Sequence, residues 1–263
     1  MEQFSLTKLT KSKYVVATNS GTSALHVSCI LMNIKKNDEV IIPAFTFVGT
    51  VNAVKYCDAI PHFVDIEENT LGINVEKLEK YLNKIAKVKN NICINKFTGR
   101  KIKAVIPVHV FGHFMKINEL KKLARKFKLM VIEDAAEAVG SYLKRKHAGT
   151  FGDIGILSFN GNKTITCGSG GAILTSSKKI EKKARHLIST AKIGHPFNYI
   201  HDEIGYNYRL PNLNAALGCA QMEQLDDFLA SKRNLAKRYK DTICSNIASF
   251  FEEPNDCNSN YWL

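Results

Sequence analysis

Short apolar runs alternate along this chain with longer segments of helical periodicity, and this alternation restricts the possible folds more than any other feature. Seven runs are predicted as strands, several of them apolar throughout, as strands covered on both faces should be: residues 14–17, 39–42, 61–64, 103–108, 129–133, 154–159 and 172–175. Helical periodicity fills most of the gaps, at residues 22–32, 47–56, 75–86, 117–127 and 178–189. The sequence therefore predicts an α/β fold with an open, mainly parallel sheet and helices on both faces.

The length and the charge of the chain set wider bounds. With 263 residues, 45% of them hydrophobic, the chain can bury one large core, or a core and a satellite. The formal net charge of +13 means that an anionic partner must be considered. Its basic residues are spread over several predicted helix faces, whereas a nucleic-acid module concentrates them in one stripe with interleaved aromatic residues. We expect solvated helix faces and no nucleic-acid partner.

Cysteine usage and hydropathy bear on the compartment. No two of the seven cysteines have the spacing of zinc ligands, and the start of the chain, MEQFSLTKLTKSKY, lacks the pattern of a secretory signal. Free thiols in a reducing cytoplasm are the simplest account. The longest weakly polar stretch, residues 40–54, is too short to span a bilayer. We expect a cytoplasmic protein without a membrane partner.

Lys163 stands in the most informative segment, GTFGDIGILSFNGNKTITCGSGG. It follows the predicted strand that contains Ser158, precedes a glycine cluster, and lies downstream of the pair Glu133 and Asp134, which ends another predicted strand. A lysine amine can form an imine with an aldehyde cofactor, and an aspartate can keep a pyridine nitrogen protonated. These are the two tasks that pyridoxal phosphate chemistry sets a protein.

Two further segments allow the same interpretation, and each has an alternative. Residues 19–24, NSGTSA, begin a predicted helix directly after a strand, where free backbone N–H groups favour a phosphate; an ordinary Ser/Thr helix cap is the other interpretation. A buried Asp134 needs a cationic partner such as a pyridinium N–H, although it could also be a metal ligand or a helix cap. The glycines after Lys163 suit either contact with a flat cofactor or a plain turn.

These segments, together with IIPAFTFVGTVNAV, PVHVFGH and GYNYRLPNLNAALGCAQMEQLD, resemble the pyridoxal-phosphate-dependent sugar aminotransferases of the DegT/DnrJ/EryC1/StrS family, which have fold type I. The resemblance covers nearly the whole chain. It implies pyridoxal 5'-phosphate as cofactor, glutamate as amino donor and a nucleotide-linked keto-sugar as acceptor. The runs HDEIGYNYRLPNLNAALG and FNGNKTIT are most similar to the branch that acts on 4-keto-6-deoxy sugars in surface-glycan synthesis.

The resemblance also implies residue roles. Lys163 is similar to the lysine that carries the cofactor and acts as the base, Asp134 to the partner of the pyridinium nitrogen, and Phe47 to the aromatic residue that stacks on the ring. Glu137 is expected near the ring hydroxyl, where many relatives have glutamine. The phosphate is expected to contact Gly21, Thr22, Ser23 and Ser158, and also Asn207 of a neighbouring subunit. The implied assembly is a homodimer with a shared active site.

Other interpretations remain open. His109 and His113 follow a predicted strand and could touch substrate, but no third ligand accompanies them, so we expect no metal. Some relatives catalyse sugar dehydration with histidine in place of the lysine, and Lys163 argues against that reaction. A binding or regulatory protein that keeps the fold without turnover is the remaining alternative.

The resemblance implies a division into two parts. Residues 1–228 are expected to form the cofactor-binding large domain. Residues 229–263 are expected to form a connecting helix and the start of an incomplete C-terminal small domain. The helix is expected to include residues 226–239, so that it begins just before this boundary. We expect a chain truncated at both ends, with an exposed apolar surface where the small domain would pack.

Overall fold

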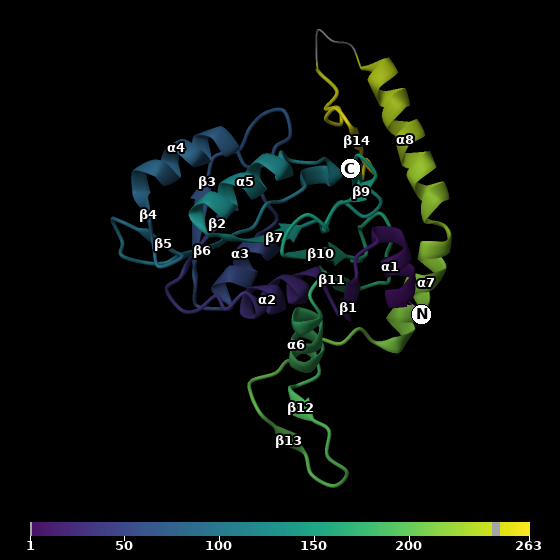
Figure 1. The fold of residues 1–263 in the computed structure, drawn as a ribbon. Helices are drawn as coiled ribbons and strands as arrows, with labels where there is room; N and C mark the ends of the chain where they lie inside the picture. Colours follow the sequence, from purple (N-terminus) through teal and green to yellow (C-terminus); the bar gives the residue numbers. More distant parts are fainter. Residues whose placement is uncertain (1, 244–247) are drawn as a thin grey trace.

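A computed structural model describes residues 2–243 and 248–263, with side chains from residue 5 onward. Its centre is a seven-stranded sheet in the order β1-β11-β10-β7-β6-β2-β3 (Figure 1). The bounds of these strands are β1 Tyr14–Thr18, β11 Gly171–Thr175, β10 Ile154–Ser158, β7 Met130–Asp134, β6 Ile102–Val105, β2 Glu39–Pro43 and β3 Ile60–Val64. The five strands from β10 to β3 are parallel, and β11 is antiparallel to both β10 and β1. The predicted α/β fold with a mainly parallel sheet is confirmed.

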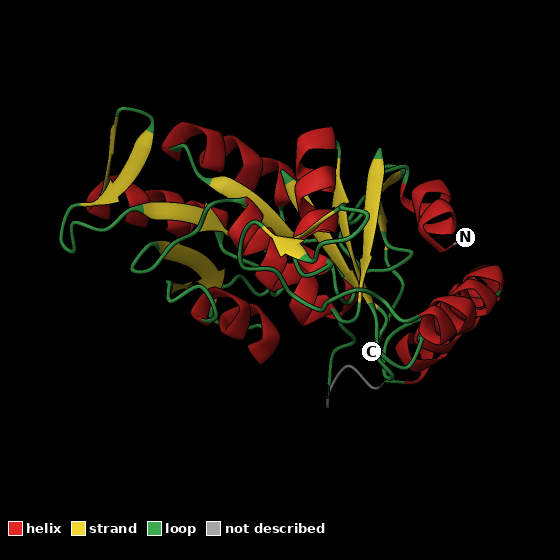
Figure 2. Cartoon of the chain, turned by 90° about the horizontal axis from the view of Figure 1, so that it is seen from below, coloured by secondary structure: helices red, strands yellow, loops and turns green. Residues whose placement is uncertain are grey.

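Helices cover both faces of the sheet, as Figures 1 and 2 show. One face packs against α2 (Gly21–Leu31), α3 (Val48–Lys55) and α6 (Lys178–Ile188), and the other against α4 (Val75–Ile85) and α5 (Ile117–Phe127). Strand β2 shows why: Val40 and Ile42 belong to the core cluster formed with α2, α3 and α6, and Ile41 belongs to the cluster formed with α4 and α5. Side chains alternate across a strand, so an apolar run with both faces covered contributes to two cores at once.

Side-chain caps begin three of these helices. Ser20, Asn74 and Ser177 each accept a hydrogen bond from the backbone N–H three residues later, at the starts of α2, α4 and α6. Such caps satisfy amide groups that have no partner within the helix. The five predicted helices agree with the observed ones within a residue or two. The strand predicted at 103–108 ends earlier, at Val105, because Pro107 has no N–H to donate to a neighbouring strand.

Several described elements were not predicted from the sequence. The helices among them are α1 (Glu2–Thr10) and α7 (Asn212–Glu223), and α8 (Leu225–Thr242) extends the helix expected at 226–239. The others are η1 (Val110–Gly112) and the short strands β4 (Ala86–Lys89), β5 (Ile92–Asn95), β8 (Tyr142–Leu143), β9 (Lys146–His147), β12 (Lys192–Ile193), β13 (Ile200–His201) and β14 (Cys257–Asn258). The hairpin β12–β13 projects from the body of the protein below α6 (Figure 1).

In the described residues, no helix combines the length and the apolar character needed to cross a membrane. No disulfide joins the six cysteines in the described residues, and Cys244 lies outside those residues.

A buried carboxylate fixes the loop beside the central strands. Glu133 is 0% exposed, and its Oε1 accepts hydrogen bonds from Gly149 N at 2.6 Å and His109 Nε2 at 2.8 Å. Its Oε2 accepts from Phe151 N at 2.7 Å and Gly152 N at 2.8 Å. Burial on its own would raise the pKa of Glu133, but these hydrogen bonds hold that pKa below its usual value. Glu133 therefore anchors residues 149–152 to β7 as a carboxylate.

We expect the substitution Glu133→Ala to lower the free energy of unfolding by about 3–5 kcal/mol, because it leaves three backbone N–H groups, two of them buried and one partly buried, without an acceptor. Urea unfolding measures the change. The matched control is Glu79→Ala, which removes only an exposed ion pair with Lys126 and should cost less than about 1 kcal/mol. Equal losses in the two variants would show that Glu133 is not an anchor.

A buried histidine makes the stability depend on pH. His147 Nε2 accepts a hydrogen bond from Gly140 N at 3.0 Å, and its Nδ1 donates to the Ala148 carbonyl, so the neutral ring satisfies both partners. Burial lowers the pKa of His147 to about 4. The unfolded state therefore binds the proton first, and the stability that is fully present above about pH 6.5 is lost as the pH falls from there towards 4.

This loss amounts to about 1.4 kcal/mol for each pH unit within that window. We expect His147→Gln to flatten the pH dependence of the unfolding free energy by about one proton between pH 4 and 6.5. Urea unfolding at a series of pH values measures the slope for the parent protein and for the variant, and an unaltered slope in the His147 variant would contradict the assignment.

Candidate active site

The three segments singled out in the sequence meet at one edge of the central sheet. The register pairs Thr18 at the end of β1, and Ser158 at the end of β10, with Gly171 at the start of β11. Asp134 ends β7, which runs parallel to β10. Ligands of open α/β sheets bind beyond the carboxyl ends of the strands, and this edge is where those ends lie.

The start of α2 lies close against the end of β10. A Cβ atom added at Gly21 would lie 2.8 Å from the Cβ of Ser158 and 3.0 Å from its Oγ, so only glycine allows this approach. Ser20 caps the helix, because its Oγ accepts from Ser23 N at 3.0 Å. The helix-cap interpretation is therefore correct, and it is compatible with an anion site because the positive end of the helix dipole remains at this edge.

Thr22 connects this helix start to the next one. A Cβ atom at Gly49, in the first turn of α3, would lie 3.0 Å from Thr22 Oγ1 and 3.1 Å from the ring of Phe47. Phe47 is the N-cap residue of α3 and is 68% exposed, so its ring is open to solvent at the edge of the site. Two helix N-termini thus face the same region.

Asp134 is buried, with 4% of its surface exposed. Thr50 Oγ1, in α3, donates a hydrogen bond to Asp134 Oδ2 at 2.8 Å, and Ala136 N donates to Oδ1 at 3.1 Å. Burial raises the pKa of Asp134, while these hydrogen bonds and the nearby Lys163 charge oppose the rise. A carboxylate held in this way is stabilised further by any cationic group that enters beside it.

The amine of Lys163 lies beside Glu137, and the charge of Asp134 also acts on it. Its Nζ is 3.6 Å from Glu137 Oε1, and Glu137 Oε2 accepts a hydrogen bond from Phe111 N at 2.8 Å. Burial lowers the pKa of Lys163, while the charges of Glu137 and Asp134 oppose the fall. Burial also raises the pKa of Glu137. Both shifts favour the neutral forms, so this pair can exchange a proton at lower cost than the same groups in water.

Phe111 presents its amide to Glu137 from a strained backbone. Its φ is +55°, in the left-handed region that residues other than glycine rarely adopt. Such strain costs of order 1–3 kcal/mol and persists only where the surrounding structure enforces it.

Two residues near the end of the described chain belong to this site and were missed in the sequence. Asn260 is 0% exposed, and its Nδ2 donates to the carbonyl of Glu137 at 2.8 Å. Trp262 is 6% exposed, its Nε1 donates to the carbonyl of Asn162 at 2.7 Å, and its ring centroid is 3.9 Å from Lys163 Nζ. The signal was available, because a lone tryptophan beside asparagine in an apolar stretch is seldom solvent-exposed surface.

Asn207 lies near the helix start within its own chain. Its side chain is exposed, and its carbonyl accepts a hydrogen bond from Asn19 Nδ2 at 3.5 Å. Asn19 Oδ1 is buried without a hydrogen-bond partner, which is an uncommon and costly arrangement for an amide oxygen. The role of Asn207 in a neighbouring subunit stays a prediction.

The expectation that His109 and His113 touch substrate is wrong. The chain turns inward after Val108, so His109 is 0% exposed and bonded to Glu133, where it contributes to the core anchor. His113 is 2% exposed, and its Nδ1 lies 3.1 Å from Ser259 Oγ. Burial lowers the pKa of His113 to about 4. Both residues stabilise the loop from within.

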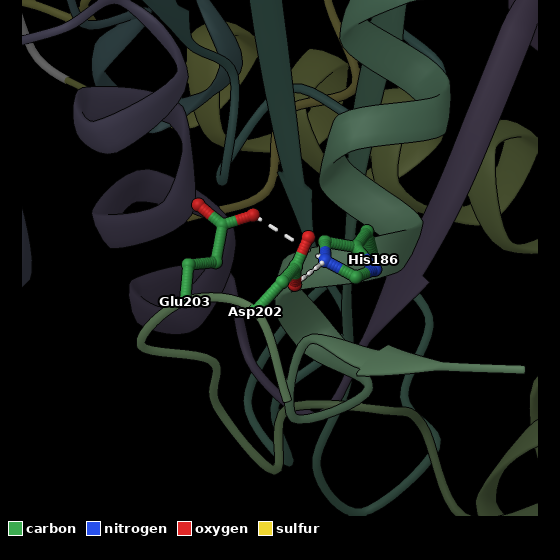
Figure 3. Close-up of side chains that lie close together, drawn as sticks. All are labelled: His186, Asp202 and Glu203. Carbon is green, nitrogen blue, oxygen red and sulfur yellow. Dashed lines mark hydrogen bonds and ion pairs between the residues drawn. The ribbon is translucent and has the colours of Figure 1, made fainter. Parts of the chain in front are cut away.

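Figure 3 shows the one group in the described part of the chain whose side chains could surround a metal ion, formed by His186, Asp202 and Glu203. His186 Nε2 lies 2.6 Å from Asp202 Oδ1 and 3.4 Å from Glu203 Oε1, and Glu203 also pairs with Lys183. These ion pairs connect α6 to the segment after β13 and account for the cluster without an ion. None of the predicted cofactor residues belongs to it.

Known proteins show the same fold and sequence pattern. Residues 2–262 match the DegT/DnrJ/EryC1/StrS aminotransferase family. GDP-perosamine synthase of Escherichia coli O157:H7 is 40% identical over 251 residues, which cover 95% of this chain and 64% of that protein. The chain thus spans 64% of the length of this relative.

Solved structures agree. The structure of a DegT DnrJ EryC1 StrS aminotransferase from Brucella abortus superposes with a TM-score of 0.88 at 27% identity, covering 99% of this chain and 67% of that one. DesV of S. venezuelae, solved in complex with a ketimine intermediate, gives a TM-score of 0.86 at 25% identity over 99% of this chain and 66% of that one. This chain belongs to the DegT/DnrJ/EryC1/StrS aminotransferase family.

Proposed function

We propose that this chain binds pyridoxal 5'-phosphate through Lys163 and transfers an amino group from glutamate to a nucleotide-linked keto-sugar. The observation that carries the proposal is a largely buried amine beside the acidic residues at and just after the end of β7: Lys163 Nζ lies 3.6 Å from Glu137 Oε1, and the charge of Asp134 also acts on it. The family membership and the DesV complex with a ketimine intermediate support this chemistry.

The residues present fit the cofactor. Because Gly21 packs directly against Ser158, the free N–H groups at the start of α2 and the Ser158 hydroxyl lie close together, and an anion can accept hydrogen bonds from both. We assign the phosphate to Gly21, Thr22, Ser23 and Ser158 of one subunit and Asn207 of a second. Asp134 would hold the ring nitrogen, Glu137 would lie near the ring hydroxyl, and Phe47 would cover one face of the ring.

When bound, the cofactor supplies an electron sink for the carbanion that transamination requires. Asp134 keeps the ring nitrogen protonated, and the hydrogen bonds from Thr50 and Ala136 hold its carboxylate in one orientation. Lys163 acts as the general base at the Cα proton of the amino donor, because burial lowers the pKa of its amine. Glu137 can accept or return a proton across the 3.6 Å that separates it from Nζ.

The sugar substrate and the assembly are inferred from other observations. The name of the E. coli relative, GDP-perosamine synthase, identifies a GDP-linked sugar, and a formal charge of +13 suits a nucleotide diphosphate. We assign a 4-keto-6-deoxy hexose as the acceptor, in a cytoplasmic step of surface-glycan synthesis. Exposed apolar side chains support a homodimer, because burying them against a second subunit removes them from water. Four between residues 197 and 213 are at least 80% exposed: Phe197, Tyr199, Ile204 and Leu213.

The direct test is isotope transfer. We expect the chain, supplied with pyridoxal phosphate, ¹⁵N-glutamate and a GDP-linked 4-keto-6-deoxy sugar, to yield a ¹⁵N-labelled amino sugar that mass spectrometry detects. Lys163→Arg should abolish the label, and Asp134→Asn should reduce the rate by about 10²–10⁴-fold, because the ring nitrogen is no longer held protonated. Unlabelled sugar that has lost water would instead favour the dehydratase, and binding of both ligands without either product would favour a non-catalytic protein.

A second test concerns the assignment of the phosphate to the start of α2. We expect Gly21→Ala to weaken pyridoxal phosphate binding by about tenfold or more, because the new methyl group displaces Ser158 and removes a hydrogen bond to a charged group. Fluorescence titration measures the affinity. Gly194→Ala, where no atom lies within 4 Å of the added Cβ, is the matched control and should bind as the parent does. Equal affinity in all three proteins would place the phosphate elsewhere.

A further inference from the structure

Trp262 is the only tryptophan in the chain, and it lies against the amine on which the proposed function rests. The ring is fixed at both ends. The backbone N of Trp262 donates to Asn260 Oδ1 at 3.0 Å, and the indole Nε1 donates to the carbonyl of Asn162 at 2.7 Å. Because Asn162 directly precedes Lys163, the ring and the amine are held by the same short loop.

Asn260 is itself locked. Its Nδ2 donates to the carbonyls of Glu137 and Val139 at 2.8 and 2.9 Å and lies 3.1 Å from Thr164 Oγ1. Its backbone N donates to Ser141 Oγ at 3.0 Å. A Cβ atom added at Gly112 would lie 1.8 Å from Asn260 Oδ1, so the surrounding backbone leaves this amide no space to move. The segment that carries Trp262 is therefore anchored to the loop that carries Glu137.

We propose that Trp262 is a positioning residue for Lys163. The face of its indole ring holds the free ε-ammonium of Lys163 beside Glu137. The proposal rests on the proposed function in one respect only, namely that Lys163 binds the cofactor and acts as the base. A lysine side chain has four rotatable bonds, and a fixed place for its nitrogen removes most of the search that would precede each attack or proton transfer.

The electrostatic effect of the Trp262 ring on the amine of Lys163 has a definite sign. An aromatic face attracts a cation and so favours the charged amine, by an amount that grows when the contact is desolvated. The charged groups that face the amine, Glu137 and Asp134, act in the same direction, whereas burial acts against it. The ring thus offsets part of the cost of burial, and its removal should make the amine lose its proton at lower pH.

A purely structural role would behave differently. A ring that only fills space supports the charged and neutral amine equally, so its replacement would change the stability of the fold but not the pH at which Lys163 titrates. The titration midpoint of Lys163 therefore separates the two roles.

Because the chain has one tryptophan, growth on fluorinated tryptophan alters Trp262 alone. Fluorine withdraws electron density from the ring with little change of shape. We expect the pH midpoint for acetylation of Lys163 by acetic anhydride, followed by mass spectrometry of its peptide, to fall step by step with each added fluorine. Lys192, whose Nζ lies 3.8 Å from the ring of Tyr199, is the internal control and should keep its midpoint.

Substitutions complete the test. Trp262→Leu should lower the midpoint of Lys163 by about 0.5–1.5 pH units, and Trp262→Phe by less. Circular dichroism checks that each variant folds. If Trp262→Leu does not fold, the titration of the fluorinated protein decides between the two roles. A midpoint that stays constant through the fluorinated series would overturn the proposal. The labelling needs no cofactor, so failure of Lys163 to bind pyridoxal phosphate would refute the proposed function and leave this inference standing.

Discussion

The site depends on one electrostatic arrangement: the buried carboxylate of Asp134 at the end of β7, and the largely buried amine of Lys163, on which the charge of Asp134 acts. Neither charge would be stable there alone, because the burial of an unpaired charge costs several kcal/mol. Asp134 is held by Thr50 and Ala136, and Lys163 lies beside Glu137 and Trp262. The helices and loops around the sheet edge supply those partners, so the fold and the chemistry depend on the same contacts.

Two adjacent residues of β7 serve different purposes: one anchors a loop, and the other presents a carboxylate to the candidate site. Glu133 points into the core and accepts three backbone hydrogen bonds and one from His109, while Asp134 points to the candidate site. Successive side chains of a strand face opposite sides, so a single Glu-Asp pair can anchor a loop and present a functional carboxylate. The anchor fixes residues 149–152, which directly precede β10 and, beyond it, the loop of Lys163.

Much of this arrangement could be predicted from the sequence, because its signals are local. Periodicity predicted the strands and helices, and Ser20 caps the helix start that follows the first strand. The order of the motifs then predicted that their residues lie at one edge of the sheet, as the register confirms for Asp134 and Ser158. The rest depends on contacts between distant residues. Asn260 contacts Glu137, and Trp262 contacts Asn162, although the two members of each pair are 123 and 100 residues apart in the sequence. Hydrophobic periodicity cannot predict contacts between such distant residues. His109 was misassigned for the same reason, since its partner Glu133 is identified only by the tertiary fold.

The most direct measurement of the central claim is chemical trapping. The protein is incubated with pyridoxal phosphate and reduced with borohydride, and the modified peptide is identified by mass spectrometry. The account predicts a single reduced adduct on Lys163, accompanied by loss of a yellow chromophore, and no adduct in Lys163→Arg. An adduct on another lysine, or no chromophore at saturating cofactor, would contradict it.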